Sequence, residues 1–411
     1  MIATTDQTGE HELVELEELL RTAGVASVGE IVQHRAAPHP NSYLGSGKLE
    51  ELKADLGKAD ANLVACDDEL APRQERTLEA ALGVPVIDRT AIILDIFAQH
   101  AHTAEGKLQV ELAQLEYNLA RMRGLWSHLE RLGGGIGTRG PGESQIETDR
   151  RLARDRIAAL KRRLAGVRAS RSVMRAERER AWLPQVALAG YTNAGKSTLL
   201  NALTGAAVGV GERLFHTLDP TTRVLEAGGR SYLLTDTVGF IRKLPHQLVD
   251  AFGATLEETR LAQLILHVVD GSAEEEELVA MITAVEDVLH EIGADEAPQL
   301  LVLSKSDLIP SERGRELAHR HPGALLVSAQ TGEGLDGLIA RIEREFERAL
   351  QPVELLIPYD HGAELAQLHE LAGDLEREDT EAGTRVRARL PVAVASRYGR
   401  FAVRRSSPAA A

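Results

Sequence analysis

A glycine-rich segment that ends in lysine and serine carries the strongest chemical signal in the sequence. It spans Gly190 to Ser197 and fits the pattern G-x-x-x-x-G-K-S. The apolar run Val186 to Leu188 precedes it and a helix-forming run from Thr198 follows it, which is the context that this pattern requires. Backbone amides of such a loop point inward at phosphate oxygens, and the helix N-terminus adds a favourable dipole. The segment therefore predicts a phosphate-binding loop.

The charged end of this loop predicts its contacts with phosphate and metal. Lys196 would neutralise the β and γ phosphates of a nucleotide, and Ser197 would ligate Mg²⁺. A simple glycine turn is the alternative interpretation, and the probability of a chance match in a chain of this composition is about one in a hundred. We expect the nucleotide to contact Gly190, Tyr191, Thr192, Asn193, Ala194, Gly195, Lys196, Ser197 and Thr198.

Three shorter motifs follow, each at the end of an apolar, strand-like run. In the first, Asp236 can hold Mg²⁺ through water and the Gly239 amide can sense the γ-phosphate. In the second, the Asp307 carboxylate can accept hydrogen bonds from N1 and N2 of guanine, a donor pair that adenine lacks. In the third, Ser328 and Ala329 would offer backbone amides to the base oxygen O6. The motif residues are Asp236, Thr237, Val238, Gly239, Ser304, Lys305, Ser306, Asp307, Ser328 and Ala329.

The order of these motifs resembles the translation-factor class of GTPases across residues 181–350. Two positions depart from the usual pattern. Ser304 stands where GTPases usually carry Asn, so we expect looser binding of GTP and GDP, with the preference for guanine kept by Asp307. Phe240 stands where Ras-like enzymes carry a Gln that orients water. Hydrolysis without a partner should therefore be slow, on the order of 10⁻⁴ to 10⁻² per second.

The stretch between the phosphate loop and Asp236 offers three threonines for a switch that contacts Mg²⁺ and the γ-phosphate. By resemblance Thr217 is the choice, whereas chemistry alone would not separate it from Thr221 or Thr222. The resemblance thus implies Ser197 and Thr217 as metal ligands, and Lys196, Thr217 and Gly239 as catalytic residues. We also expect nucleotide contacts from Phe215, His216, Thr217, Leu218 and Asp219.

A closer resemblance appears outside the nucleotide motifs. The run from Gly140 to Arg151 (GPGESQIETDRR) is similar to the signature of the HflX family of ribosome-associated GTPases. The runs 105–115, 45–52 and 236–246 are similar to other motifs of that family. The resemblance implies binding to the large ribosomal subunit in the GTP state, splitting or rescue of stalled or dormant ribosomes, and release on GTP hydrolysis.

Other interpretations stay open at this point. The chain could be a ribosome-assembly or RNA-binding factor in which the nucleotide is structural, or a small-molecule kinase or ATPase on the same P-loop fold. The loop Gly45 to Lys48 (GSGK) could contact a phosphate or RNA backbone, but it lacks the full loop spacing and a structural turn is favoured.

The elements that must position these residues follow from hydrophobic periodicity. The first hundred residues alternate helix-like and strand-like stretches, which favours βαβ units on a small parallel sheet. Apolar stripes over 108–122 and 153–167 predict two long helices that form an antiparallel hairpin with a glycine-rich tip at 133–137. We expect an N-terminal α/β domain over 1–100, a helical hairpin arm over 101–180, a GTPase domain with a mixed, mostly parallel sheet over 181–350, and a small α+β C-terminal domain over 351–411.

Charge is distributed unevenly along the chain. The 411 residues carry a net charge of −15, which alone would disfavour a nucleic-acid partner. Residues 150–180 nevertheless hold 12 Arg or Lys and three acids, a local charge of +9 on the second arm helix. A solvated helix face or an RNA contact would explain this run. The single Cys66, the acidic start and the lack of an apolar run near the about 18 residues of a membrane span predict a cytoplasmic protein, and we expect a monomer.

Overall fold

The computed structural model describes residues 1–5, 13–122, 141–180, 183–206, 214–215, 217–243, 245, 253–348, 350–372 and 375–403. Its contacts divide the chain into two compact units. The first comprises Met1–Arg171, Gly211–Asp219 and Val238–Glu257, and the second comprises Ser172–Val210, Pro220–Thr237 and Glu258–Ala411. Two short segments from the middle of the chain thus cluster with the N-terminal residues.

The first unit begins with a parallel sheet in the order β2-β1-β3-β4. Its strands are β1 (Ile2–Thr5), β2 (Ile31–His34), β3 (Val64–Cys66) and β4 (Val86–Asp88). They alternate with α1 (Val14–Thr22), α2 (Ser46–Ala59), α3 (Pro72–Leu82) and α4 (Arg89–His100). The predicted βαβ alternation is confirmed, although the sequence did not predict β1.

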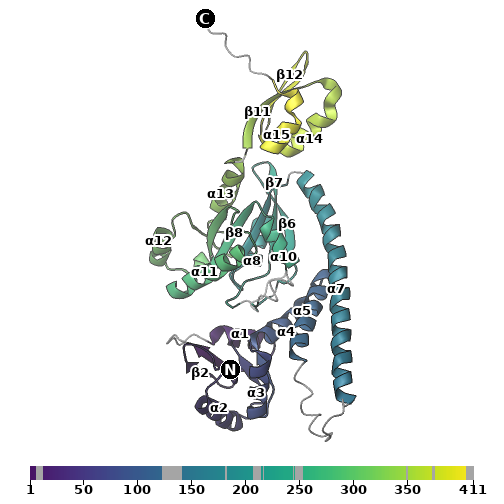
Figure 1. The fold of residues 1–411 in the computed structure, drawn as a ribbon. Coiled ribbons are helices and arrows are strands. Elements are labelled where there is room, and N and C mark those ends of the chain that lie inside the picture. Colours follow the sequence, from purple (N-terminus) through teal and green to yellow (C-terminus); the bar gives the residue numbers. More distant parts are fainter. Residues whose placement is uncertain are drawn as a thin grey trace. The chain divides into compact units, whose positions relative to one another are not determined.

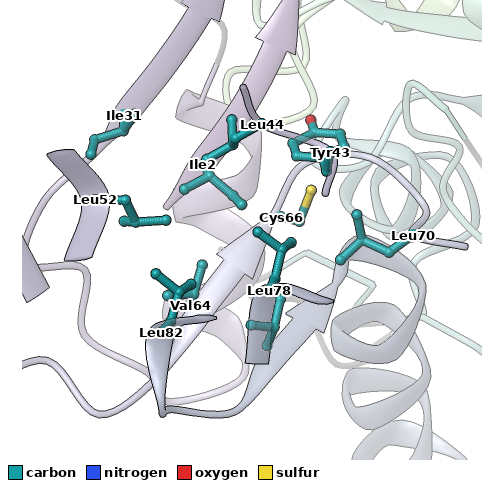
Figure 2. Packing of buried hydrophobic residues seen from close by; sticks show 11 residues of the cluster. Ile2, Ile31, Tyr43, Leu44, Leu52, Val64, Cys66, Leu70, Leu78 and Leu82 are labelled. Atoms are coloured by element: carbon teal, nitrogen blue, oxygen red, sulfur yellow. The ribbon is translucent and has the colours of Figure 1, made fainter. Parts of the chain in front are cut away.

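An apolar cluster holds this sheet to its helices (Figure 2). Ile2 and Cys66 are fully buried, and leucines from α2 and α3 pack against them. Burial raises the pKa of the Cys66 thiol, so the only cysteine behaves as a packed apolar group. Gly45 is the N-cap of α2 and its amide donates to Oε1 of Gln33 at 2.8 Å, as expected of a structural turn.

The arm consists of α5 (Ala104–Arg121) and α7 (Pro141–Arg180), which lie beside each other in Figure 1. Arg156 pairs with Glu111 at 2.6 Å and Lys161 with Glu116 at 2.8 Å, so part of the basic run faces acids of the neighbouring helix. The glycine-rich tip lies outside the described residues. Four buried leucines form the seam between the helices: Leu108, Leu112, Leu160 and Leu164.

The second unit contains a mixed sheet in the order β10-β9-β8-β5-β7-β6. Only β6 runs antiparallel to its neighbour. The strands are β5 (Gln185–Gly190), β6 (Thr221–Ala227), β7 (Arg230–Asp236), β8 (Leu264–Asp270), β9 (Gln299–Ser304) and β10 (Leu325–Leu326). The helices of this unit are α8 (Lys196–Thr204), α11 (Glu275–Glu291), α12 (Ser311–Arg320) and α13 (Leu335–Arg348), while α10 (Gly253–Arg260) begins in the first unit and ends in the second. This arrangement confirms the predicted P-loop fold.

The C-terminal part confirms the predicted α+β class. Its antiparallel sheet has the order β11-β13-β12, with β11 (Leu350–Ile357), β12 (Leu375–Thr380) and β13 (Gly383–Pro391). Helices α14 (Gly362–Ala372) and α15 (Val392–Arg397) pack on it through an apolar cluster. Across the described part of the chain, no helix combines the length and apolar character that crossing a membrane needs.

Candidate nucleotide-binding site

The predicted motifs of the second unit lie at the carboxyl ends of neighbouring parallel strands. The phosphate loop follows β5, Asp236 ends β7, and Ser304 ends β9. Ser328 follows β10. Because the carboxyl ends of parallel strands meet at one edge of a sheet, this edge is where open α/β folds bind ligands. The strand order therefore brings separate motifs of the sequence to one edge.

The phosphate loop turns tightly between β5 and α8. A Cβ atom on Gly190 would lie 2.1 Å from the backbone oxygen of Val268 on β8, so only glycine fits where β5 ends. Asn193 and Gly195 have positive φ angles of 60° and 87°. Successive turns of this kind direct backbone amides toward one point and form an anion-binding nest. The loop then opens directly into the N-terminus of α8, whose dipole also favours an anion.

Lys196 is buried within this loop. Its Nζ donates to the backbone oxygens of Gly190 at 3.0 Å and Tyr191 at 2.8 Å. Burial lowers the pKa of Lys196 to about 8, and the attraction of Asp236 partly opposes that shift. A buried cation held against neutral carbonyls is strongly attracted to a phosphate anion, because few water molecules screen the charge.

Ser197 and Asp236 supply neighbouring hard oxygen atoms. The Ser197 hydroxyl donates to Oδ2 of Asp236 at 2.5 Å. Asp236 is fully buried, and the next residue, Thr237, donates its hydroxyl to the backbone oxygen of Leu188 at 2.8 Å. The hydrogen bond from Thr237 to Leu188 fixes the end of β7 to β5, so the Asp236 carboxylate has a defined position. A hydroxyl beside a carboxylate is the ligand chemistry that Mg²⁺ prefers.

Ser304 connects the predicted base motif to the phosphate loop. Its buried hydroxyl lies 2.7 Å from the backbone oxygen of Ala194 and 3.0 Å from that of Val269. Lys305 pairs with Asp270 at 2.5 Å. Asp307 lies in a short 3-10 helix, Ser306–Leu308, with an exposed side chain. An exposed carboxylate at this edge is available to a base.

The third motif is built around its own turn. The Ser328 amide donates to the backbone oxygen of Glu333 at 2.9 Å, and its hydroxyl accepts from the Thr331 amide at 3.1 Å. Ser306 donates its amide to the oxygen of Val327 at 3.1 Å, which ties this turn to the base motif. The Ser328 amide is therefore already engaged within the turn, and Ala329 is the other residue that the sequence predicts to contact the base.

The other predicted residues belong to the first unit. Val238, Gly239 and Phe240 follow β7 and are buried there. Thr217 and Leu218 also lie in this unit, and His216 lies outside the described residues. Thr221 and Thr222, the open alternatives to Thr217, are paired residues of β6 in the second unit.

One cluster of charged residues beside the segment that follows Gly239 was not predicted. Arg89, the first residue of α4, is 2% exposed and donates to Glu15 and Asp67, both at 2.8 Å, and to the backbone oxygen of Arg242 at 2.9 Å. Lys243 pairs with Asp67 at 3.0 Å and with Asp68 at 2.6 Å. The sequence signal was present in the run 236–246, but its partners are distant in the sequence.

Comparison with known proteins finds three family models along the chain. The family described as "GTP-binding GTPase N-terminal" matches residues 10–98, and "GTP-binding GTPase Middle Region" matches residues 100–178. The family described as "50S ribosome-binding GTPase" matches residues 185–305.

Named relatives are similar over nearly the whole chain. GTPase HflX of Lacrimispora saccharolytica is 46% identical over 400 residues, which cover 95% of this chain and 93% of that protein. GTPase HflX of Escherichia coli K12 is 44% identical over 386 residues, which cover 93% and 90%. A solved structure of a GTP-binding protein from Sulfolobus solfataricus in complex with GDP is 25% identical, with a TM-score of 0.42, and covers 84% of this chain and 97% of that one.

Proposed function

The chain belongs to the HflX family of GTPases, and from this premise we propose that it acts on the large ribosomal subunit. In its GTP state it binds that subunit and splits or rescues stalled or dormant ribosomes, and hydrolysis of GTP releases it. The proposal is supported by the occurrence, in one chain, of the four nucleotide motifs and a helical arm that carries exposed arginines.

The nucleotide is held at both ends by residues of the sheet edge. Lys196 and the amides of the phosphate loop bind the phosphates, and Asp307 accepts hydrogen bonds from the guanine base. Ser197 and Thr217 would supply oxygen atoms to Mg²⁺, and Asp236 would hold it through water. When bound, Mg²⁺ neutralises charge on the phosphate oxygens.

In GTP hydrolysis, the residue after Gly239 cannot orient the attacking water. Phe240, which follows Gly239, is fully buried and has no group that orients water. The contribution of Lys196 is electrostatic, because it offsets negative charge on the β and γ phosphates. Hydrolysis therefore stays slow until the ribosome supplies or orders the missing group.

The arm provides the ribosome contact. Arg151, Arg154, Arg162 and Arg163 are exposed on α7, and exposed arginines contact backbone phosphates of folded RNA without reading its sequence. We expect the protein to act as a monomer.

Turnover and binding measurements test the proposal. Purified large subunits should raise GTP turnover, and binding to them should be tighter with a non-hydrolysable GTP analogue than with GDP. Lys196→Ala should remove this nucleotide dependence, because it removes the charge on the phosphates. If large subunits leave turnover unchanged and Lys196→Ala binds as the wild type does with either nucleotide, the proposal is wrong.

A deletion separates the arm from the nucleotide site. A chain without residues 133–142 should keep its GDP affinity but lose ribosome splitting, measured by light scattering of intact ribosomes. Splitting that survives the deletion would remove the arm tip from the mechanism. Binding independent of nucleotide would favour an assembly or RNA-binding factor in which the nucleotide is structural.

A further inference from the structure

The carboxylate of Asp219 holds the first turn of the arm helix α5. It accepts hydrogen bonds from the backbone amides of His102 at 3.1 Å and Thr103 at 2.8 Å, and from the Thr103 hydroxyl. These donors lie 116 or 117 residues away in the sequence. An anion at a helix N-terminus is favoured by the helix dipole, and charge-assisted hydrogen bonds are stronger than neutral ones.

Gly106 makes room for this contact. Its amide donates to the Thr103 hydroxyl oxygen at 2.9 Å, so Thr103 is the N-cap of α5 while Asp219 acts as a second cap from outside the helix. A Cβ atom on Gly106 would lie 2.5 Å from Oδ1 of Asp219, closer than such atoms can approach. A glycine within a helix is unfavourable, so its presence in the first turn matches the need for close approach.

The rest of this segment also packs on the first unit. We name residues 214, 215 and 217–219 the switch segment. Phe215 meets Phe97 of α4 edge to face, with ring centroids 4.7 Å apart, and the Leu214 amide donates to Oγ1 of Thr22 at 3.3 Å. Leu214, Phe215 and Leu218 are buried. The segment is therefore anchored along its length, and Asp219 is its last residue in this unit.

We propose that Asp219 is a positioning residue that passes the nucleotide state of the switch segment to the arm through the N-terminus of α5. The inference rests on the proposed function, in which Thr217 responds to the γ-phosphate. Two residues of chain span at most about 7 Å, so a displacement of Thr217 acts directly on Asp219. Because α5 is a continuous helix of 18 residues, a displacement of its first turn moves the rest of the helix with it.

Substitutions in and next to α5 test the contact between Asp219 and α5 without altering the phosphate or base motifs. Gly106→Ala should displace the Asp219 carboxylate while favouring the helix itself. Gly166→Ala is the matched control, because Gly166 lies on the other arm helix and a Cβ there would meet no atom within 4 Å. Thr103→Val should act as Gly106→Ala does, and Thr103→Ser, which keeps the hydroxyl, should restore the wild-type behaviour.

The first readout needs no ribosome. Hydrogen exchange of the His102 and Thr103 amides is measured in the full chain with GDP and with GMPPNP, a non-hydrolysable GTP analogue. Wild type, Gly166→Ala and Thr103→Ser should show different protection of these amides with the two nucleotides. In Gly106→Ala and Thr103→Val that difference should fall at least about fivefold, the lower end of typical coupling effects. Equal protection with both nucleotides in the wild type, or an undiminished difference in Gly106→Ala, would overturn the inference.

The second readout separates this inference from the proposed function. The ratio of large-subunit affinities with GMPPNP and with GDP should fall about tenfold in Gly106→Ala and stay unchanged in Gly166→Ala, while GDP affinity stays within about threefold of wild type in both. If the wild type itself shows no nucleotide dependence, the proposed function fails, and hydrogen exchange alone decides whether the switch segment is coupled to α5.

Discussion

Ser304 shows how one hydroxyl group can link the two ends of a nucleotide site. It is buried between the backbone oxygens of Ala194 in the phosphate loop and Val269 at the end of β8. A hydroxyl has a single proton, so it donates to only one of these carbonyls at a time, whereas an Asn amide has two protons. Ser304 therefore holds the phosphate loop with fewer protons than an Asn would, which gives the expected loosening of nucleotide binding a physical basis.

Substitution of Ser304 tests this link. Ser304→Ala should weaken GDP binding up to about tenfold, because the phosphate loop loses the hydrogen bond that holds it at Ala194, with a net contribution of about 0.5–1.5 kcal/mol. Ser304→Asn should bind GDP at least as tightly as the wild type, since its amide can serve both carbonyls. Fluorescent GDP titration gives the affinities, with Ser311→Ala at an exposed position as the control. Wild-type affinity in Ser304→Ala would contradict the link.

His267 makes the stability of the second unit depend on pH. It lies in the middle of β8, 3% exposed, and its pKa is lowered to about 4 by burial, with a smaller contribution from the positive charge of Lys196. The pKa of an unfolded histidine is about 6.5. As pH falls through the window from 6.5 to 4, the unfolded state binds a proton that the folded state does not, so stability is lost.

The expected loss between pH 7 and pH 5 is about 2 kcal/mol, from the linkage relation. Hydrogen exchange of the β8 amides measures the opening free energy of this sheet at each pH. His267→Gln should be about 2 kcal/mol less sensitive over this interval, while His319→Gln, at an exposed position on α12, should keep the wild-type pH dependence. Identical pH profiles for wild type and His267→Gln would show that His267 binds a proton equally in both states.

At the scale of elements, α1, α4, the residue after β3 and the segment after β7 meet at one buried arginine. Arg89 joins Glu15 and Asp67 and donates to the backbone oxygen of Arg242. Burial raises the pKa of Asp67, although the charges of Arg89 and Lys243 act in the opposite direction. Both cations thus stabilise the buried carboxylate, and the Arg242 side chain also pairs with Glu15 at 3.1 Å. The ion pairs of Arg242 and Lys243 hold the segment after β7 against the N-terminal residues.

Removal of Arg89 should destabilise the first unit severely. Arg89→Met removes the buried cation and leaves Glu15 only Arg242 and Asp67 only Lys243 as partners. Removal of one partner of a buried ion pair typically costs about 3–5 kcal/mol. Arg89→Lys keeps the charge but loses the planar fork, so its loss should be smaller. Urea denaturation gives the values, and Arg76→Met, at an exposed position of α3, should stay within about 0.5 kcal/mol of wild type. Equal stability of Arg89→Met and Arg76→Met would contradict this role for the cluster.

Elements with strong local patterns could be predicted, and those that depend on distant pairing could not. The leucine stripes of α5 and α7 repeat on one helix face, so their seam follows from periodicity. The strand β1 has four residues and no alternation, and it exists because it pairs with β2 and β3. The phosphate loop was found from its own spacing, whereas the role of Asp219 depends on donors more than a hundred residues away. Local chemistry therefore predicted the nucleotide motifs but not the contacts that couple them to the arm.

For the whole molecule, the distribution of charge matters more than its sum. Residues 150–180 carry +9, so the other residues sum to −24. Ion pairs with Glu111 and Glu116 engage Arg156 and Lys161, while Arg162 and Arg163 are exposed and form no ion pair with a described residue. Salt screens exposed charges beyond about 8 Å, so an RNA surface near α7 interacts with these arginines rather than with the distant acidic residues.

Reversal of both charges should therefore weaken ribosome binding in a way that depends on salt. In Arg162→Glu/Arg163→Glu, the plot of log affinity for large subunits against log salt concentration should become shallower by about 1 to 2, because each lost phosphate contact removes about 0.7–0.9 from the slope. Arg315→Glu/Arg344→Glu changes the net charge equally at exposed positions of α12 and α13 and should keep the wild-type slope. An unchanged slope in the arm variant would mean that this face is only solvated. An equal effect in both variants would mean that net charge, not the position of the arm, governs the encounter with RNA.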